Sequence, residues 1–235
     1  MLMQAAVPRT LLDNFAIFAV MRKFFSLIVL PVVLLVSCQK DKSSEPAKPA
    51  PVDLGLSVYW ADINAQGFYS WGETLTKTSY DWAGYKWADG TRDSITKYCD
   101  NPIYGTVDGN TLLEAGDDPA TALLGSGWRL PTAAEWQELI DNCDWSKDTK
   151  DGHPGLRVKA KEGESSIFIP FSGGYEGSTL FGEDSRGLYW SRELSTESAA
   201  CATVFNCYSS SSSIVRGVTY ASRSYGLPIR AVKIK

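Results

Sequence analysis

Apolar residues alternate with small or polar residues at the start of the aromatic-rich part of the chain. Leu54, Leu56, Val58 and Trp60 recur at every second position, and a period of two predicts a strand with one buried face. Further short runs of β-branched and aromatic residues, separated by Gly-rich or Ser-rich turns at 172–174, 177 and 209–213, predict strands at 68–71, 166–169, 188–191, 201–208, 214–220 and 228–234. The stretch 76–104 has no sustained period and is predicted to be a long loop.

Two helices are predicted between these strands from their capping residues. Asp118 supplies an N-cap acceptor before a proline at the first helical position, and Gly125 ends a short helix over 119–124. Thr132 and Glu135 have the spacing of a capping box. One apolar stripe follows at i, i+3, i+4 and i+7, formed by Trp136, Leu139, Ile140 and Cys143. The pattern predicts one α+β domain over residues 53–235, with two helices packed on a mostly antiparallel sheet and long loops.

The first 37 residues have the composition of an export signal. Arg22 and Lys23 follow Met21 and precede an uncharged apolar run over 24–36, which is typical of a secretory signal peptide. The run is shorter than the about 20 residues that a membrane-spanning helix needs. Residues 1–20 would place a second apolar stretch ahead of the charged region, so we expect translation to start at Met21 and the signal peptide to end at residue 37.

The segment Leu35-Val36-Ser37-Cys38 resembles the cleavage site of bacterial lipoproteins. In those proteins the cysteine is acylated after cleavage just before it, so the resemblance implies lipidation of Cys38, and several acyl chains anchor a protein stably to a membrane. Residues 39–52, which follow the expected lipidation site, contain Pro and Ser but no aromatic residue. We therefore expect 38–52 to be a flexible tether. Position 39 holds Gln and not the acidic residue that resembles an inner-membrane retention signal, so the resemblance implies the outer membrane, with the domain facing either the periplasm or the cell surface.

The composition agrees with a folded domain and argues against some classes of binding partner. The 235 residues are 44% hydrophobic and 12% aromatic, which excludes a disordered or fibrous protein. A net charge of -4 argues against a nucleic-acid surface, which needs clustered basic residues. The single histidine, His153, lies in a turn-like sequence and is expected to be exposed. No G-x-S-x-G motif accompanies it to supply a nucleophile.

The block from Trp128 to Trp136 resembles a segment of the C-type-lectin-like superfamily branch that includes the formylglycine-generating enzymes. The wider sequence is more similar to the Fibrobacter succinogenes major paralogous domain family of bacterial lipoproteins. That resemblance covers nearly all of 53–235, through matches at 52–61, 71–74, 96–98, 117–118, 128–136, 167–170, 189–191 and 229–232. It implies a C-type-lectin-like α+β fold on an exported lipoprotein whose molecular function is unassigned.

A copper-dependent oxidase resembling the formylglycine-generating enzymes is the least favoured alternative. Those enzymes hold copper with two nearby cysteines, and soft thiolates suit that metal. Cys201 and Cys207 form the only near pair here, and their spacing and surroundings differ from the family pattern. Six positions along a strand span about 20 Å, so we expect both to be packing residues. The sequence leaves open the disulfide state of Cys99, Cys143, Cys201 and Cys207.

Hard oxygen ligands gather between residues 108 and 118. The carboxylate and amide oxygens that Ca²⁺ prefers are supplied there by Asp108, Asn110, Glu114, Asp117 and Asp118, and proteins of the implied fold often hold this ion. The spacing does not match a helix–loop–helix calcium loop. A cap role for Asp118 within a solvated acidic loop explains the same residues and is preferred. We therefore expect no cofactor, with a calcium site as the alternative.

Large aromatic side chains lie in the otherwise polar stretch 76–104. Trp82, Tyr85 and Trp87, with Tyr80 nearby, offer flat faces on which sugar rings stack. Such side chains also commonly cover a core beneath a loop, and this second interpretation is preferred. If the domain binds a ligand, we expect the ligand to contact this loop.

These features together predict a lipoprotein held on the outer membrane through Cys38. The domain is expected to be a non-enzymatic binding or adhesion module for a glycan or a protein partner, without nucleic-acid contacts. A structural role in a cell-envelope assembly is the alternative.

Overall fold

The computed structural model describes residues 47–235. The predicted signal peptide over 1–37, the start at Met21, the lipidation site Cys38 and the first part of the tether lie outside the described residues, so they stay predictions. No helix in the described part has the length and hydrophobicity that crossing a membrane requires.

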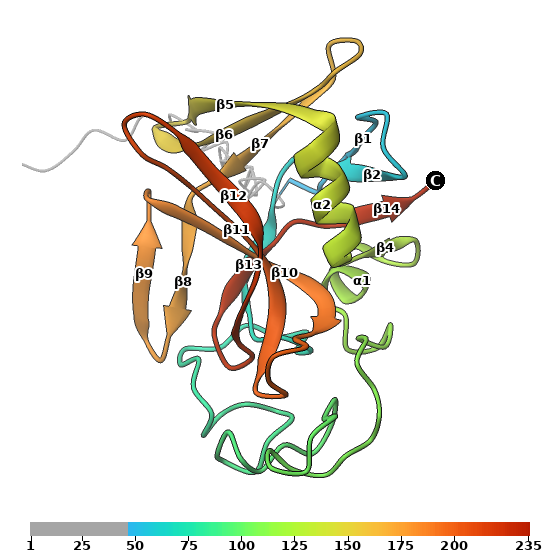
Figure 1. Ribbon diagram of the computed structural model, residues 1–235, viewed down its shortest axis with the longest axis vertical. Coiled ribbons are helices and arrows are strands. Elements are labelled where there is room, and N and C mark those ends of the chain that lie inside the picture. Colours follow the sequence, from blue (N-terminus) through green and yellow to red (C-terminus); the bar gives the residue numbers. More distant parts are fainter. Residues whose placement is uncertain (1–46) are drawn as a thin grey trace, which may run out of the picture. The chain divides into compact units, whose positions relative to one another are not determined.

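Strands dominate the described domain, which is 44% strand and 8% helix (Figure 1). Its helices are α1 at Pro119–Leu124 and α2 at Ala133–Asn142. The prediction of an α+β fold with two helices packed on a sheet is therefore wrong, and with it the C-type-lectin-like class that the resemblance implied. The main reason is that polar and Gly-rich segments between residues 143 and 183 form strands that the hydrophobic pattern did not predict.

Within residues 47–235 the strands are arranged in four sheets (Figure 1). The largest has the order β12-β11-β10-β8-β9, with bounds Ile214–Ser222, Cys201–Ser209, Arg186–Leu194, Ser172–Glu176 and Thr179–Glu183. A second has the order β1-β2-β14-β4, with bounds Pro51–Val52, Val58–Ala61, Val232–Ile234 and Trp128–Arg129. A third has the order β5-β6-β7, with bounds Cys143–Lys150, His153–Ala160 and Ser166–Pro170. The fourth pairs β13, Leu227–Ile229, with β3, Ala65–Tyr69.

Neighbouring strands in these sheets run antiparallel except β8 and β10, which are parallel at Gly173 and Gly187. β11 and β12 pair from Cys201–Ser222 to Ser209–Ile214, so the serine run at 209–213 makes the predicted hairpin connection. β1 pairs with β2, so the folded domain begins within the predicted tether. No named strand lies within 76–104, in agreement with the predicted loop.

Both predicted helix starts are confirmed by their hydrogen bonds. The Asp118 carboxylate accepts from the backbone N–H groups of Ala120 and Thr121, which leaves fewer unpaired donors at the start of α1. Thr132 and Glu135 form the reciprocal capping box at the start of α2. The helix ends at Asn142, because Cys143 already has extended backbone and begins β5.

Large aromatic side chains fill two hydrophobic clusters. In the first, Trp136 of α2 stacks on Phe205 of β11 with ring centroids 4.3 Å apart, and Trp60 lies 4.6 Å from Trp136. The second contains Trp71 and Trp190, both fully buried. Because the residues of β2, β7, β10 and β14 contribute to these clusters, their packing fixes the strands whose ends surround the cavity described below.

Candidate functional site

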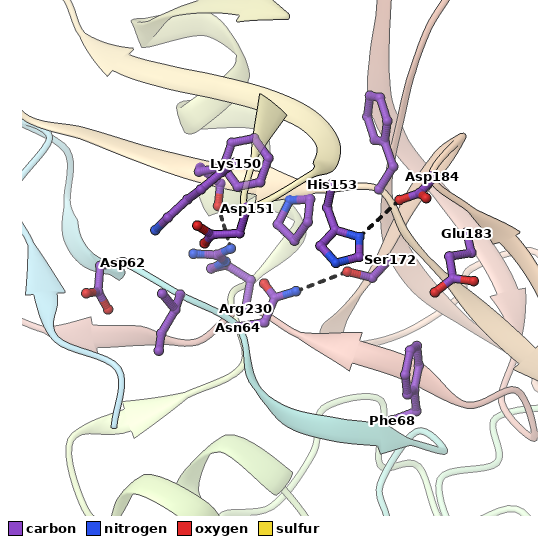
Figure 2. Close-up of a pocket in the computed structure, with 14 residues that line it drawn as sticks. Asp62, Asn64, Phe68, Lys150, Asp151, His153, Ser172, Glu183, Asp184 and Arg230 are labelled. Atoms are coloured by element: carbon purple, nitrogen blue, oxygen red, sulfur yellow. Dashed lines mark hydrogen bonds and ion pairs between the residues drawn. The ribbon is translucent and has the colours of Figure 1, made fainter. Parts of the chain in front are cut away.

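A cavity of about 370 Å³ combines apolar walls with converging polar side chains (Figure 2). Its lining residues come from segments far apart in the sequence, between Asp62 and Arg230. The loop after β2, the turn between β5 and β6, the end of β7 and the end of β9 each contribute. Its volume lies within the range of small-molecule sites in proteins, about 300–1,000 Å³.

Three phenylalanines form most of the apolar wall. Phe168 on β7 and Phe171 just after it are buried. Phe68 on β3 is partly exposed, and its ring meets the ring of Tyr175 edge-on, with centroids 4.9 Å apart. The apolar lining consists of Ile63, Phe68, Phe168, Pro170 and Phe171. A partly exposed ring held by a neighbouring ring offers a firm flat surface to a ligand.

Arg230 lies between β13 and β14, lines the cavity and is fully buried. Its Nη1 donates to the Ala61 oxygen at 2.9 Å and its Nη2 to the Phe168 oxygen at 2.7 Å. Its Nε has no hydrogen-bond partner. Burial lowers the pKa of the guanidinium, but arginine stays protonated in proteins. The cavity is therefore lined by a buried positive charge with a donor to spare.

Asn64 adds a second polar group whose hydrogen bonding is incomplete. Its Nδ2 donates to Ser172 Oγ at 3.4 Å and to the Tyr189 hydroxyl at 3.3 Å (Figure 2). Its Oδ1 is buried and has no partner. Within residues 47–235, seven buried side-chain nitrogen or oxygen atoms lack a hydrogen-bond partner, and the Arg230 Nε and the Asn64 Oδ1 are the two that belong to residues lining this cavity.

Charged residues line the outer part of the cavity. His153 Nδ1 lies 3.3 Å from Asp184 Oδ1, and both side chains are more than half exposed, at 63% and 52% (Figure 2). The remaining charged lining residues are Asp62, Lys150, Asp151 and Glu183. Carboxylates thus outnumber lysine around the opening, and carboxylate oxygens accept hydrogen bonds from hydroxyl groups.

A tight turn places His153 at the opening. Lys150 and His153 are register partners across β5 and β6, so Asp151 and Gly152 form a two-residue connection. Their φ values are +53° and +85°, as in the hairpin turn that Asp-Gly sequences favour. The structure confirms that His153 is exposed, but it is the first residue of β6 rather than part of the turn.

The residues predicted as calcium ligands are engaged in separate hydrogen-bond networks. Asp108 accepts from the backbone N–H groups of Tyr98, Cys99 and Asn110 at 2.8, 3.0 and 3.1 Å, and Asn110 Nδ2 donates to the same carboxylate. Burial alone would raise the pKa of Asp108, but these hydrogen bonds outweigh it and lower that pKa. No group of three or more His, Cys, Asp or Glu side chains within 47–235 is placed to hold a metal ion.

Asp117 and Asp118 point into different surroundings. Asp117 Oδ2 lies 2.7 Å from Lys97 Nζ and accepts from the Tyr98 hydroxyl at 2.8 Å. Asp118 is fully buried and accepts from the backbone of Leu130 as well as from the start of α1. Burial raises the pKa of Asp118, against the effect of these hydrogen bonds. The preferred cap role of Asp118 is confirmed.

The predicted aromatic contact residues are turned mainly into the protein. Tyr85 is 2% exposed, and its hydroxyl donates to the Trp71 oxygen at 2.7 Å. Trp87 is half-buried and its Nε1 donates to the Gly72 oxygen at 2.7 Å. The half-buried Trp82 ring meets Tyr85 edge-on at 5.3 Å. None of the three lines the cavity in Figure 2.

Cys99, Cys143, Cys201 and Cys207 are all free thiols. Cys201 begins β11 and Cys207 lies six positions further along it, and they pair with Ser222 and Arg216 of β12. Burial raises the pKa of Cys201, and it raises the pKa of Cys207 to about 12. The two cysteines lie six positions apart along one extended strand, a separation of about 20 Å, which does not fit joint ligation of copper by two thiolates.

Comparisons with family models, with curated proteins and with solved structures find no match to this chain. The resemblance to the Fibrobacter succinogenes family therefore stays a prediction.

Sequence reasoning considered His153 but missed the other charged and aromatic residues of the cavity. One usable signal was present, because Asp-Gly at 151–152 favours a two-residue hairpin turn. Such a hairpin predicts that His153 and Lys150 lie side by side. Nothing in the sequence indicates that Arg230, which is 77 residues beyond His153, belongs to the same site.

Proposed function

We propose that this protein is an exported, lipid-anchored and non-enzymatic binding module, and that its cavity binds carbohydrate. The observation that carries the proposal is the combination in one opening of the partly exposed ring of Phe68 with several carboxylates and the amide of Asn64. An aromatic face packs against the apolar face of a sugar ring, while carboxylate and amide oxygens accept hydrogen bonds from its hydroxyl groups.

The unpaired polar atoms support this choice over a purely structural role. Five other buried side-chain atoms of residues 47–235 also lack partners, but the Arg230 Nε and the Asn64 Oδ1 supply an unpaired donor and an unpaired acceptor in the lining of one cavity. A polar ligand that enters the cavity could supply their partners after small side-chain movements. Sugars carry both donors and acceptors, so one ligand of this class could satisfy both atoms.

Binding of the full chain to a panel of immobilised glycans tests the proposal. Phe68→Ala removes the exposed aromatic wall and is expected to lower binding at least about tenfold, because stacking and apolar burial are both lost. Trp82→Ala is the matched control, since it removes a larger half-buried ring outside the cavity. Equal binding by Phe68→Ala and the parent chain would contradict the cavity as the site.

The lipid anchor has a separate test. Cells that express the full chain are grown with labelled palmitate. The parent protein is expected to incorporate the label, and the Cys38→Ala protein is not. Label that persists on the Cys38→Ala protein would overturn the anchor without affecting the proposed binding site.

A further inference from the structure

We propose that the carbohydrate bound in this cavity carries a carboxylate, as in a uronic acid, and that Arg230 recognises that carboxylate. This inference rests on the proposed function and names the substrate class of the same site.

The first observation is that Arg230 is a buried charge without an ion-pair partner in contact with it, although the charge of Asp62 in the same cavity acts on it from a longer distance. No Asp or Glu oxygen of the described residues lies within 4.0 Å of its guanidinium nitrogens. Its two protein hydrogen bonds go to uncharged backbone oxygens of Ala61 and Phe168. An unpaired buried charge is strongly destabilising, so a bound anion beside Arg230 would relieve a cost that the free protein carries.

A second fully buried arginine in the same domain, Arg223, likewise has no carboxylate oxygen of residues 47–235 within 4.0 Å, but each of its guanidinium nitrogens has a hydrogen-bond partner. Arg223 donates from Nε to the Tyr85 hydroxyl, from Nη1 to the oxygens of Tyr98 and Ala199, and from Nη2 to the Lys97 oxygen. All three of its nitrogens are engaged, whereas Arg230 has an unpartnered Nε and lines a cavity. The buried Nε atoms of Arg192 and Arg216 also lack partners, but these two residues are only partly buried and neither lines the cavity. Arg230 combines full burial, an unpartnered Nε and a place in the cavity lining, which points to a missing partner there.

The rest of the cavity favours a sugar acid over a simple anion. Four carboxylates line it, on Asp62, Asp151, Glu183 and Asp184, against one lysine, Lys150. This excess of negative charge repels a bare anion, but it accepts hydrogen bonds from hydroxyl groups. A uronic acid has a carboxylate at one end and several hydroxyls around the ring, so it offers an acceptor to Arg230 and donors to the carboxylates at the opening.

Nuclear magnetic resonance titrations of the full chain in detergent with matched sugars test the inference. The probes are the methyl glycosides of glucuronic, galacturonic and mannuronic acid, each compared with the neutral methyl hexoside of the same configuration. The members of each pair differ only at C6, where the uronide has a carboxylate and the neutral sugar a hydroxymethyl group. We expect at least one uronide to bind about tenfold more tightly than its neutral partner, the size of effect expected for a charge-assisted contact. Phe68→Ala should abolish that binding.

Two kinds of variant assign the preference to Arg230 and the charged opening. Arg230→Met is expected to remove the preference for the uronide, provided that circular dichroism shows a folded protein. Glu183→Gln and Asp184→Asn change exposed side chains, so they keep the test informative if Arg230→Met does not fold. Each is expected to strengthen uronide binding about twofold, by removing a negative charge near the ligand, with no gain for the neutral sugar.

The possible failures are distinguishable. Equal affinity for acidic and neutral sugars, with both lost in Phe68→Ala, overturns the carboxylate preference and leaves the proposed function intact. A uronide preference that persists in folded Arg230→Met, or that Glu183→Gln and Asp184→Asn both leave unchanged, overturns the role of the cavity charges. Binding of neither class of sugar overturns both proposals.

Discussion

The Tyr85 hydroxyl accepts a hydrogen bond from Arg223 Nε at 2.9 Å, across 138 positions of the sequence. Both side chains are buried, and the same guanidinium donates to backbone oxygens at Lys97, Tyr98 and Ala199. The long loop over 76–104 is thereby tied to the segment that follows β12. This arginine adds to the hydrogen bonds of Tyr80, Tyr85 and Trp87 that fix a loop without a named strand or helix.

Loss of this arginine is expected to destabilise the whole domain. Arg223→Met keeps much of the apolar stem but leaves three backbone oxygens and a hydroxyl without their donor, so the free energy of unfolding should fall by about 3 kcal/mol or more. Urea denaturation followed by tryptophan fluorescence measures the change. The matched control is Arg92→Met, because Arg92 is 62% exposed, forms an exposed ion pair with Asp93 and lies 5.9 Å from the centre of the Tyr104 ring, and it should stay within about 0.5 kcal/mol of the parent chain. Similar urea midpoints for the two variants would contradict this role of Arg223.

Asp117 is expected to contribute to the loss of stability in acid. Burial would raise its pKa, but hydrogen bonds from Lys97, Tyr98 and Lys86 outweigh burial and lower it. The unfolded chain therefore binds the proton more tightly than the folded chain, and stability rises with pH across this titration. The contribution is fully present above the ordinary aspartate pKa of about 4 and is lost as the pH falls through the lower folded value.

Asp117→Asn tests this titration. Its urea midpoint should fall less than that of the parent chain between pH 6 and pH 3, because the substituted side chain no longer titrates. Asp89→Asn changes the net charge equally at an exposed position and serves as the control. An equal acid dependence in the parent and Asp117→Asn chains would show that Asp117 does not carry this effect.

The thiol of Cys207 is expected to resist alkylation in the folded protein. Burial raises the pKa of Cys207 to about 12 and that of Cys143 to about 11, and only the thiolate reacts readily. Mass spectrometry after treatment with iodoacetamide at pH 8 should find both thiols unmodified in buffer and modified in urea. Rapid modification of Cys207 in buffer would mean that the thiol is reachable and ionised, and it would reopen the comparison with the copper oxidases.

The sequence predicted elements whose signal is local. Asp118 and Thr132 marked both helix starts through their capping geometry, and alternation from Leu54 to Trp60 marked the strand region that includes β2. These signals need only a few neighbouring residues. They do not report how much of the chain is sheet, which is why the α+β class was wrong.

The strands that were missed lack the usual hydrophobic pattern for specific reasons. β5 lies at the edge of its sheet, and most of its side chains after Cys143 are exposed and polar. β8 contains Gly173 and Gly174 and was interpreted as a loop. A Cβ on Gly173 would lie 2.1 Å from the Phe181 oxygen of β9, so the close approach of β8 and β9 requires glycine there. Glycine in a strand often marks such an approach.

The cavity escaped prediction because it depends on how distant strands pair. Arg230 reaches Ala61 and Phe168 only because β14 pairs with β2 and because β7 ends nearby. Neither the pairing of β14 with β2 nor the position of the end of β7 can be predicted from a local sequence pattern. The aromatic loop residues Trp82, Tyr85 and Trp87 gave a stronger local signal, yet the structure turns them mainly toward the protein interior.

The central claim is that sugars enter the cavity, and His153 offers the most direct measurement of it. The chain contains one histidine, which lines the opening, so untagged protein labelled with ¹⁵N gives imidazole signals that need no assignment. We predict that a bound glycan shifts these signals in proportion to occupancy, in the parent chain and in Trp82→Ala but not in Phe68→Ala. Glycan binding that saturates without moving the His153 signals would contradict the claim.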